Sequence, residues 1–225
     1  MYLSIVAPIY NDQENIKPFI NQVSQTLGKI NLEDYEIIFV LDKSEDNSFL
    51  TLKEIALNNK KIKILHLSKR YGHQESLIAG LEHSLNSDFV ITMDCDSQHP
   101  YELIPLLLNK INEGYDVVTT KRNENKDQGL WRNFFGNIFY KFSNLISDTK
   151  VENGSADFRI MNKKFVNNLI TKFPEREIFL RGLVAWVGYH HAFIEYSAQK
   201  REFGVSKFNH LKKIQFAVTG LMSLS

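Results

Sequence analysis

Short apolar runs of strand length alternate with longer segments of helical periodicity, and this alternation constrains the fold more than any other feature. The apolar runs are LSIVA (3–7), YEIIFVL (35–41), KIKILHL (61–67), DFVITM (88–93) and YDVVTT (115–120). The helical segments between them lie at about 11–27, 48–58, 75–85 and 102–112. Continuous apolar strands separated by helices are typical of parallel sheets covered on both faces. The sequence predicts an α/β fold with a Rossmann-like, mostly parallel central sheet and helices on both faces.

The pattern loosens after residue 125. We expect further helices at about 130–146, 163–172, 176–187 and from 207, and strands near 157–161 and 192–197. The final IQFAVTGLMSLS (214–225) becomes apolar behind a basic run. We therefore expect one domain over residues 1–205 and the start of a juxtamembrane helix over 206–225. Its natural membrane segment would continue past residue 225.

Composition argues against several classes of protein. The net charge of +1 gives no overall field that would favour nucleic acid. The single cysteine, Cys95, cannot form an internal disulfide, which fits a reducing compartment. No stretch reaches the roughly 18 consecutive apolar residues needed to cross a bilayer. The start, MYLSIVAPIY, lacks a basic region and a cleavage site, so it is not a signal peptide.

Polar or turn-forming residues follow each of the first five predicted strands. They are Pro8-Ile9-Tyr10, Asp42, Ser68-Lys69-Arg70, Asp94 with Asp96, and Lys121-Arg122. Open parallel sheets bind ligands beyond the carboxyl ends of their strands. The sequence therefore predicts a ligand site along this edge, which we call the rim.

Asp94 and Asp96 stand one residue apart in ITMDCDSQHP (91–100). In an extended segment residues i and i+2 point the same way, so the two carboxylates project together and repel. A Mg²⁺ or Mn²⁺ ion, which takes one or two carboxylates and completes its shell with water and phosphate oxygens, resolves that repulsion. Gln98 offers a further oxygen, so Asp94, Asp96 and Gln98 are the predicted metal ligands. In the other interpretation, Asp94 caps a turn and Asp96 caps the helix at 101–113.

Other phosphate-binding classes do not fit the sequence. A dinucleotide-binding unit needs G-x-G-x-x-G after its first strand, where this chain has PIYNDQ (8–13). A Walker loop is also absent. Phosphatases of the haloacid dehalogenase type carry D-x-D on the first strand, whereas here the motif follows the fourth.

Seven ordered motifs together resemble the inverting family 2 glycosyltransferases of the GT-A fold, and most closely the polyprenyl-phosphate sugar transferases, such as dolichol-phosphate mannosyltransferases and bactoprenol glucosyltransferases. The motifs are APIYNDQENI (7–16), FVLDKSEDNS (39–48), RYGHQESLIAGL (70–81), MDCDSQHP (93–100), SADFRIM (155–161), LRGLVAWVGY (180–189) and REFGVSK (201–207). The resemblance covers nearly the whole chain. It implies transfer of a hexose from UDP- or GDP-hexose to a polyprenyl phosphate in cell-envelope glycan synthesis. Mg²⁺ or Mn²⁺ would be the cofactor, and residues 1–205 the catalytic domain, soluble at this length and acting at the cytoplasmic face of the cell membrane.

The resemblance also implies residue roles. Asp96, Arg122 and Asp157 would act in catalysis. The residues implied to contact the nucleotide sugar are Pro8, Tyr10, Glu14, Asp42, Asp94, Gln98, Arg132, Arg201, Ser206 and Lys207. Asp157 would orient or deprotonate the acceptor, although a lipid phosphate oxygen is already anionic near pH 7.

Each role has a purely structural alternative. Asn11 and Glu14 resemble a capping pair for the first helix, Asp157 has Arg159 as an ion-pair partner, and Arg122 and Arg132 suit a solvated surface. Six histidines show no metal-ligand spacing, and we expect structural roles, with only His99 near the site. They are His73, His83, His99, His190, His191 and His210.

Two departures from the family pattern leave questions open. The usual paired acids before Gly-Ser are replaced by Leu41-Asp42-Lys43-Ser44, which leaves the nucleotide undetermined. Ala198 stands three residues ahead of Arg201, where the family has arginine. Two rival hypotheses remain, an enzyme with a glycan or glycolipid acceptor and a non-catalytic nucleotide-sugar-binding protein. The sugar, the anomer and the oligomeric state stay open too.

Overall fold

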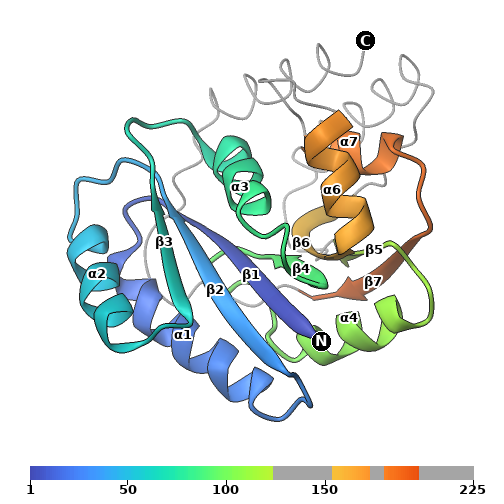
Figure 1. Cartoon of the computed structure of the whole chain (residues 1–225), viewed down its shortest axis with the longest axis horizontal. Coiled ribbons are helices and arrows are strands. Elements are labelled where there is room, and N and C mark those ends of the chain that lie inside the picture. Colours follow the sequence, from blue (N-terminus) through green and yellow to red (C-terminus); the bar gives the residue numbers. More distant parts are fainter. Residues whose placement is uncertain (124–153, 173–179, 198–225) are drawn as a thin grey trace.

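The computed structural model describes residues 1–123, 154–172 and 180–197 of the 225-residue chain (Figure 1). The strands in these ranges are β1 (Tyr2–Ile9), β2 (Asp34–Leu41), β3 (Ile62–His66), β4 (Phe89–Thr92), β5 (Val117–Arg122), β6 (Ser155–Asn162) and β7 (His191–Tyr196). The helices are α1 (Gln13–Leu27), α2 (Ser48–Asn58), α3 (His73–Glu82), α4 (Leu103–Asn112), α6 (Lys163–Lys172) and α7 (Leu180–Trp186). The predicted alternation of strands and helices is confirmed in these ranges.

The described strands form one seven-stranded sheet in the order β3-β2-β1-β4-β6-β5-β7. Strands β3, β2, β1 and β4 are parallel, β6 is antiparallel to both β4 and β5, and β7 is parallel to β5. The prediction of a mostly parallel sheet is therefore confirmed. Because β6 runs in the opposite direction, its first residues lie beside the carboxyl end of β4, where Thr92 pairs with Arg159.

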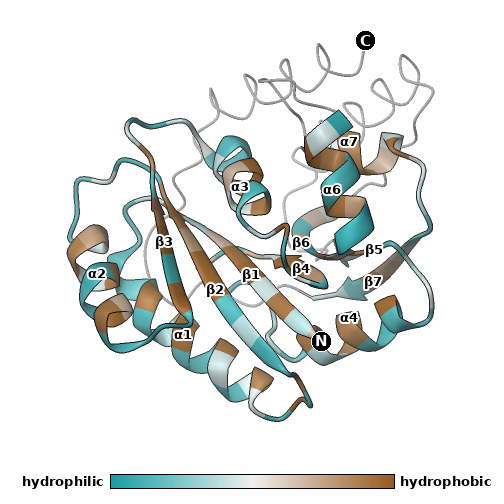
Figure 2. Cartoon of the chain, in the orientation of Figure 1, coloured by the Kyte–Doolittle hydropathy of each residue, from teal (hydrophilic) through white to brown (hydrophobic). Residues whose placement is uncertain are grey.

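Two apolar layers cover the sheet, one on each face, as predicted. Alternate residues of β1 point to opposite sides: Leu3 and Ile5 pack into the layer that contains α1 and α4, and Val6 into the layer that contains α3 and α6. The helices of the two layers are visible in Figure 1, and the apolar bands of β1 and β2 in Figure 2. This double burial explains why the strands read as continuous apolar runs.

Helix α3 packs unusually close to the sheet at Gly80. A β-carbon built there would lie 2.2 Å from Val6 Cγ1 and 3.0 Å from Val40 Cγ2. The missing side chain therefore lets α3 approach β1 and β2 closely. This approach determines where the first residues of α3 lie relative to the rim.

Two predicted helices, at 130–146 and from residue 207, lie outside the described residues, as does the beginning of the one at 176–187. Within the described ranges, no helix combines the length and apolar character needed to span a bilayer.

Candidate active site

The acidic turn, residues 94–98, follows β4 at the rim. Its backbone is constrained, since Ser97 has a φ of 59° and Asp96 Oδ1 accepts a hydrogen bond from the Gln98 amide at 3.2 Å. Helix α4 begins only at Leu103, and its N-cap, Glu102, makes no side-chain cap hydrogen bond. Asp96 is not the N-cap of this helix. The capping interpretation of Asp96 is therefore wrong.

Asp94 lies between two histidines. Its Oδ1 is 2.7 Å from His73 Nε2, and its Oδ2 is 3.9 Å from His99 Nε2. Its own backbone amide donates to His99 Nδ1 at 3.2 Å, and the His99 ring stacks on Phe158. The side chain is still 34% exposed, so its carboxylate can be reached from the rim.

The two imidazoles favour the ionised form of Asp94. Burial raises its pKa, but the charge and hydrogen bond of His73, with the charge of His99, outweigh burial and lower the pKa to about 2. Asp94 is therefore an anion at neutral pH, as a metal ligand must be.

The expectation that only His99 lies near the site is wrong, because His73 contacts Asp94 directly. Spacing could not reveal this contact, since it joins residues 21 positions apart on different elements. The available signal was the place of His73 just after the rim segment that follows the third predicted strand.

The residues of the acidic turn fit a divalent cation that arrives with a diphosphate. Carboxylate oxygens are the ligands that Mg²⁺ and Mn²⁺ prefer, and Asp94 Oδ2 is too far from His99 for a hydrogen bond. Within the described part of the chain, no group of three or more His, Cys, Asp or Glu side chains could hold a metal by itself. A metal bound here would need oxygens from water and substrate to complete its shell.

Asp157 reaches the same part of the rim from the beginning of β6. Its Oδ1 is 2.9 Å from Arg159 Nη2 in a buried ion pair, and the guanidinium also donates to the Ala156 carbonyl. Its Oδ2 is 3.9 Å from His73 Nδ1. His73 therefore stands between Asp94 and Asp157, and the ion pair foreseen from the sequence is present.

Asp42 is buried at the end of β2, where both of its oxygens accept backbone hydrogen bonds. Oδ1 accepts from Tyr71 at 2.8 Å and from Lys43 at 3.1 Å, and Oδ2 accepts from Gly72 at 2.9 Å. Gly72 has a φ of 114°, which a residue with a side chain rarely adopts. Asp42 therefore fixes the loop between β3 and α3, and its predicted contact with the nucleoside remains a prediction.

The loops after β1 and β2 are joined by side-chain hydrogen bonds. Asn11, which has a φ of 49°, donates its amide to Ser44 Oγ at 3.0 Å and accepts from the Glu45 amide at 2.7 Å. Asp46 accepts from the amide of Gln13, the first residue of α1. The predicted Asn11–Glu14 capping pair is wrong, because the N-cap is Asp12 and the bond to the helix terminus comes from the neighbouring loop.

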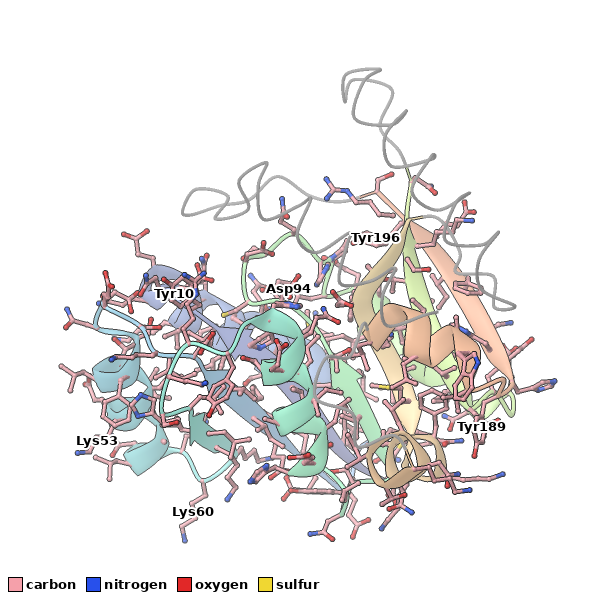
Figure 3. All side chains as sticks on the ribbon, turned by 90° about the horizontal axis from the view of Figure 1, so that it is seen from above. Tyr10, Lys53, Lys60, Asp94, Tyr189 and Tyr196 are labelled. Carbon is pink, nitrogen blue, oxygen red and sulfur yellow. The ribbon has the colours of Figure 1, made fainter. Side chains whose placement is uncertain are left out.

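The remaining predicted residues are distributed along the rim or outside the described ranges. Tyr10 follows β1 and has the Arg70 guanidinium 4.0 Å from its ring centre, and Arg122 ends β5. Figure 3, a view from above Figure 1, shows Asp94 between Tyr10 and Tyr196. Pro8 is half-buried in β1 and Glu14 is exposed on α1. The predicted residues outside the described ranges are Arg132, Arg201, Ser206 and Lys207.

The seven-stranded, mostly parallel sheet covered by helices on both faces is the fold of solved GT-A glycosyltransferases. Residues 4–170 match the family described as glycosyl transferase family 2. The chain therefore belongs to glycosyltransferase family 2, a family of enzymes, as the motifs indicated.

Relatives agree with this assignment. An uncharacterized glycosyltransferase from Synechocystis is 36% identical, over 99% of this chain and 69% of that protein. The bactoprenol glucosyl transferase of Shigella phage SfV is 34% identical, over 100% of this chain and 72% of that protein. A mannosyltransferase from Pyrobaculum calidifontis, solved with GDP-Man and Mn²⁺, shares the fold with a TM-score of 0.64 and 14% identity, covering 97% and 62% of the two chains.

Proposed function

We propose that this chain transfers a hexose, with glucose as the first candidate, from a nucleoside diphosphate sugar to a polyprenyl phosphate at the cytoplasmic face of the cell membrane. The name of the Shigella phage relative supports the choice of sugar and acceptor. The observation that carries the proposal is the acidic turn, with ionised Asp94 on one side of His73 and Asp157 on the other. In a direct transfer the donor's diphosphate and the acceptor must bind next to each other. Asp94 and Asp157, on either side of His73, offer two such neighbouring sites.

In this proposal Asp94, Asp96 and Gln98 hold Mg²⁺ or Mn²⁺ against the donor's diphosphate. The bound cation supplies positive charge that stabilises the leaving diphosphate. Pro8, Tyr10, Glu14 and Asp42 belong to the nucleotide side of the rim. Arg122, with Arg132, Arg201, Ser206 and Lys207, adds groups that balance or bind phosphate charge.

Asp157 serves the acceptor side. The acceptor's phosphate oxygen attacks the anomeric carbon as the bond from that carbon to the diphosphate breaks, and the configuration inverts. A phosphate oxygen is already anionic near pH 7, so the attack needs no base. The ion pair with Arg159 fixes the Asp157 carboxylate, so Asp157 acts by orienting the sugar or the acceptor.

The test is a transfer assay with UDP-[¹⁴C]glucose, undecaprenyl phosphate in detergent and Mn²⁺. Label should enter the organic phase, and EDTA should prevent this. Asp96→Asn should lower the rate by roughly 100-fold or more, because charge stabilisation of this kind contributes several kcal/mol. The control is Glu113→Gln, an exposed carboxylate paired with Lys110 beyond the end of α4. Label transferred only to an oligosaccharide panel, or from no UDP- or GDP-hexose, would contradict the proposal.

A further inference from the structure

Gln74 connects the acidic turn to a distant helix. It is 9% exposed near the beginning of α3, and both ends of its amide group are engaged. Oε1 accepts a hydrogen bond from the Leu180 backbone amide at 3.1 Å, across 106 residues of sequence, and Nε2 lies 3.2 Å from His73 Nδ1. Leu180 is the first residue of α7, where helical amides have no partner within their own helix.

These contacts determine where His73 carries its proton. A backbone amide can only donate, so the atom of Gln74 that faces Leu180 must be the oxygen. The amide nitrogen then faces His73, and because it too can only donate, Nδ1 must be the acceptor. The proton of the neutral ring therefore lies on Nε2, 2.7 Å from Asp94 Oδ1.

We propose that Gln74 is a positioning residue, which fixes the Nε2–H tautomer of His73 and thereby the orientation of the Asp94 carboxylate. This inference rests on the proposed function, in which Asp94 binds the cation. One oxygen of Asp94 is held by His73 at 2.7 Å, and the other lies 3.9 Å from His99 Nε2, beyond hydrogen-bond distance. Second partners that orient a ligand in this way typically affect metal affinity by 10- to 100-fold.

A merely structural role for Gln74 would be to attach α7 to α3. Gln74→Glu separates the two roles, because one Glu oxygen can still accept from Leu180. The other oxygen can only accept, so His73 would have to carry a proton on Nδ1. Gln74→Met has similar length and removes both hydrogen bonds. The matched control is Gln25→Glu, which adds the same charge at an exposed position near the far end of α1.

The first measurement is long-range ¹H–¹⁵N NMR of the histidine rings in the ligand-free protein. At a pH where the His73 ring is neutral, the wild type and Gln25→Glu should show His73 protonated on Nε2 alone, and Gln74→Glu should show a proton on Nδ1. The second is calorimetric titration of Mn²⁺ in the presence of UDP. The Kd for Mn²⁺ should rise roughly 10-fold or more in Gln74→Glu and Gln74→Met and stay unchanged in the control.

Two results would overturn the inference: an Nδ1–H tautomer in the wild type, or unchanged Mn²⁺ affinity in a folded Gln74→Glu protein. If the wild type binds no Mn²⁺ with UDP or GDP, the proposed function fails instead. The tautomer measurement needs no ligand, so it still decides what Gln74 does to His73.

Discussion

Three carboxylates along the rim, those of Asp42, Asp94 and Asp157, have different kinds of partner. Asp42 is bound by backbone amides, Asp94 by an imidazole, and Asp157 by a guanidinium. The partners suit the expected tasks, since amides fix a loop, an imidazole leaves an oxygen for a cation, and a guanidinium fixes a buried charge. The sequence identified all three acids and also the Arg159 partner of Asp157. The imidazole partner of Asp94 and the Tyr71 and Gly72 amides that bind Asp42 come from other elements, so no local pattern could reveal them.

Replacing Asp42 with alanine should destabilise the protein. The change removes the acceptor of the part-buried Tyr71 and Gly72 hydrogen bonds, and a hydrogen bond to a charged group typically contributes about 1.5–3 kcal/mol. Asp42→Asn, which keeps one acceptor oxygen, should lose less. Urea unfolding measures the effect, with Glu45→Ala, an exposed position in the same loop between β2 and α2, as the control. An Asp42→Ala protein as stable as that control would show that the carboxylate does not fix the loop.

Replacing only Arg159 of the Asp157–Arg159 ion pair should lower the free energy of unfolding markedly, because it leaves a buried charge unpaired. Replacing both residues leaves no such charge. Arg159→Met leaves a buried carboxylate without its guanidinium, at about 3–5 kcal/mol. In the double variant with Asp157→Asn no charge is left, so the loss should be smaller than the sum of the two single losses. Chemical denaturation of the three variants gives this coupling energy. Strictly additive losses would mean that the two side chains do not interact.

At the scale of elements, the direction of β6 and the height of α3 bring the site together. Strand and helix positions followed from periodicity, and the rim followed from the parallel arrangement of strands. The reversal of β6 did not, because a strand's direction depends on the path of the connecting chain, and apolar periodicity does not specify that path. That reversal is what brings Asp157 to the rim beside Asp94. Likewise, the importance of Gly80 becomes apparent only when α3 is seen against the sheet.

Gly80→Ala should therefore destabilise the fold, although alanine favours helices. The added methyl would lie 2.2 Å from Val6 Cγ1, and overpacking of this kind typically costs about 1–3 kcal/mol. Thermal unfolding of this variant should be compared with that of Glu82→Ala, at an exposed position of the same helix. A Gly80→Ala protein that is as stable as the control, or more stable, would refute the close contact.

At the scale of the whole molecule, the buried thiol of Cys95 and the part-buried phenol of Tyr2 should make the folding stability depend on pH in the alkaline range. Burial, with the charges of Asp12 and Asp96, raises the pKa of the Cys95 thiol well above its ordinary value of 9.0. Burial and the charge of Glu36 raise the pKa of Tyr2 to about 12 from an ordinary 10.0. Above those ordinary values the unfolded chain loses protons that the folded chain keeps. Stability should therefore fall as the pH rises through 9 and then 10.

Urea unfolding from about pH 8 to about pH 11 measures this loss, which reaches at most about 1.4 kcal/mol per pH unit for each group. Cys95→Ala should remove the part that begins near pH 9, and Tyr2→Phe the part that begins near pH 10. The same slope in wild type and in both variants would mean that neither group is responsible.

The central claim is that the acidic turn binds a cation together with a donor's diphosphate. A thermal-shift screen of UDP, GDP and dTDP, with Mn²⁺ or with EDTA, tests it most directly. At about 100 times its Kd, the correct nucleotide should stabilise the protein by about 2.7 kcal/mol, roughly 5 °C or more. The shift should require Mn²⁺ and should vanish in Asp94→Asn and Asp96→Asn. An equal shift in EDTA, or one that survives both substitutions, would contradict the claim.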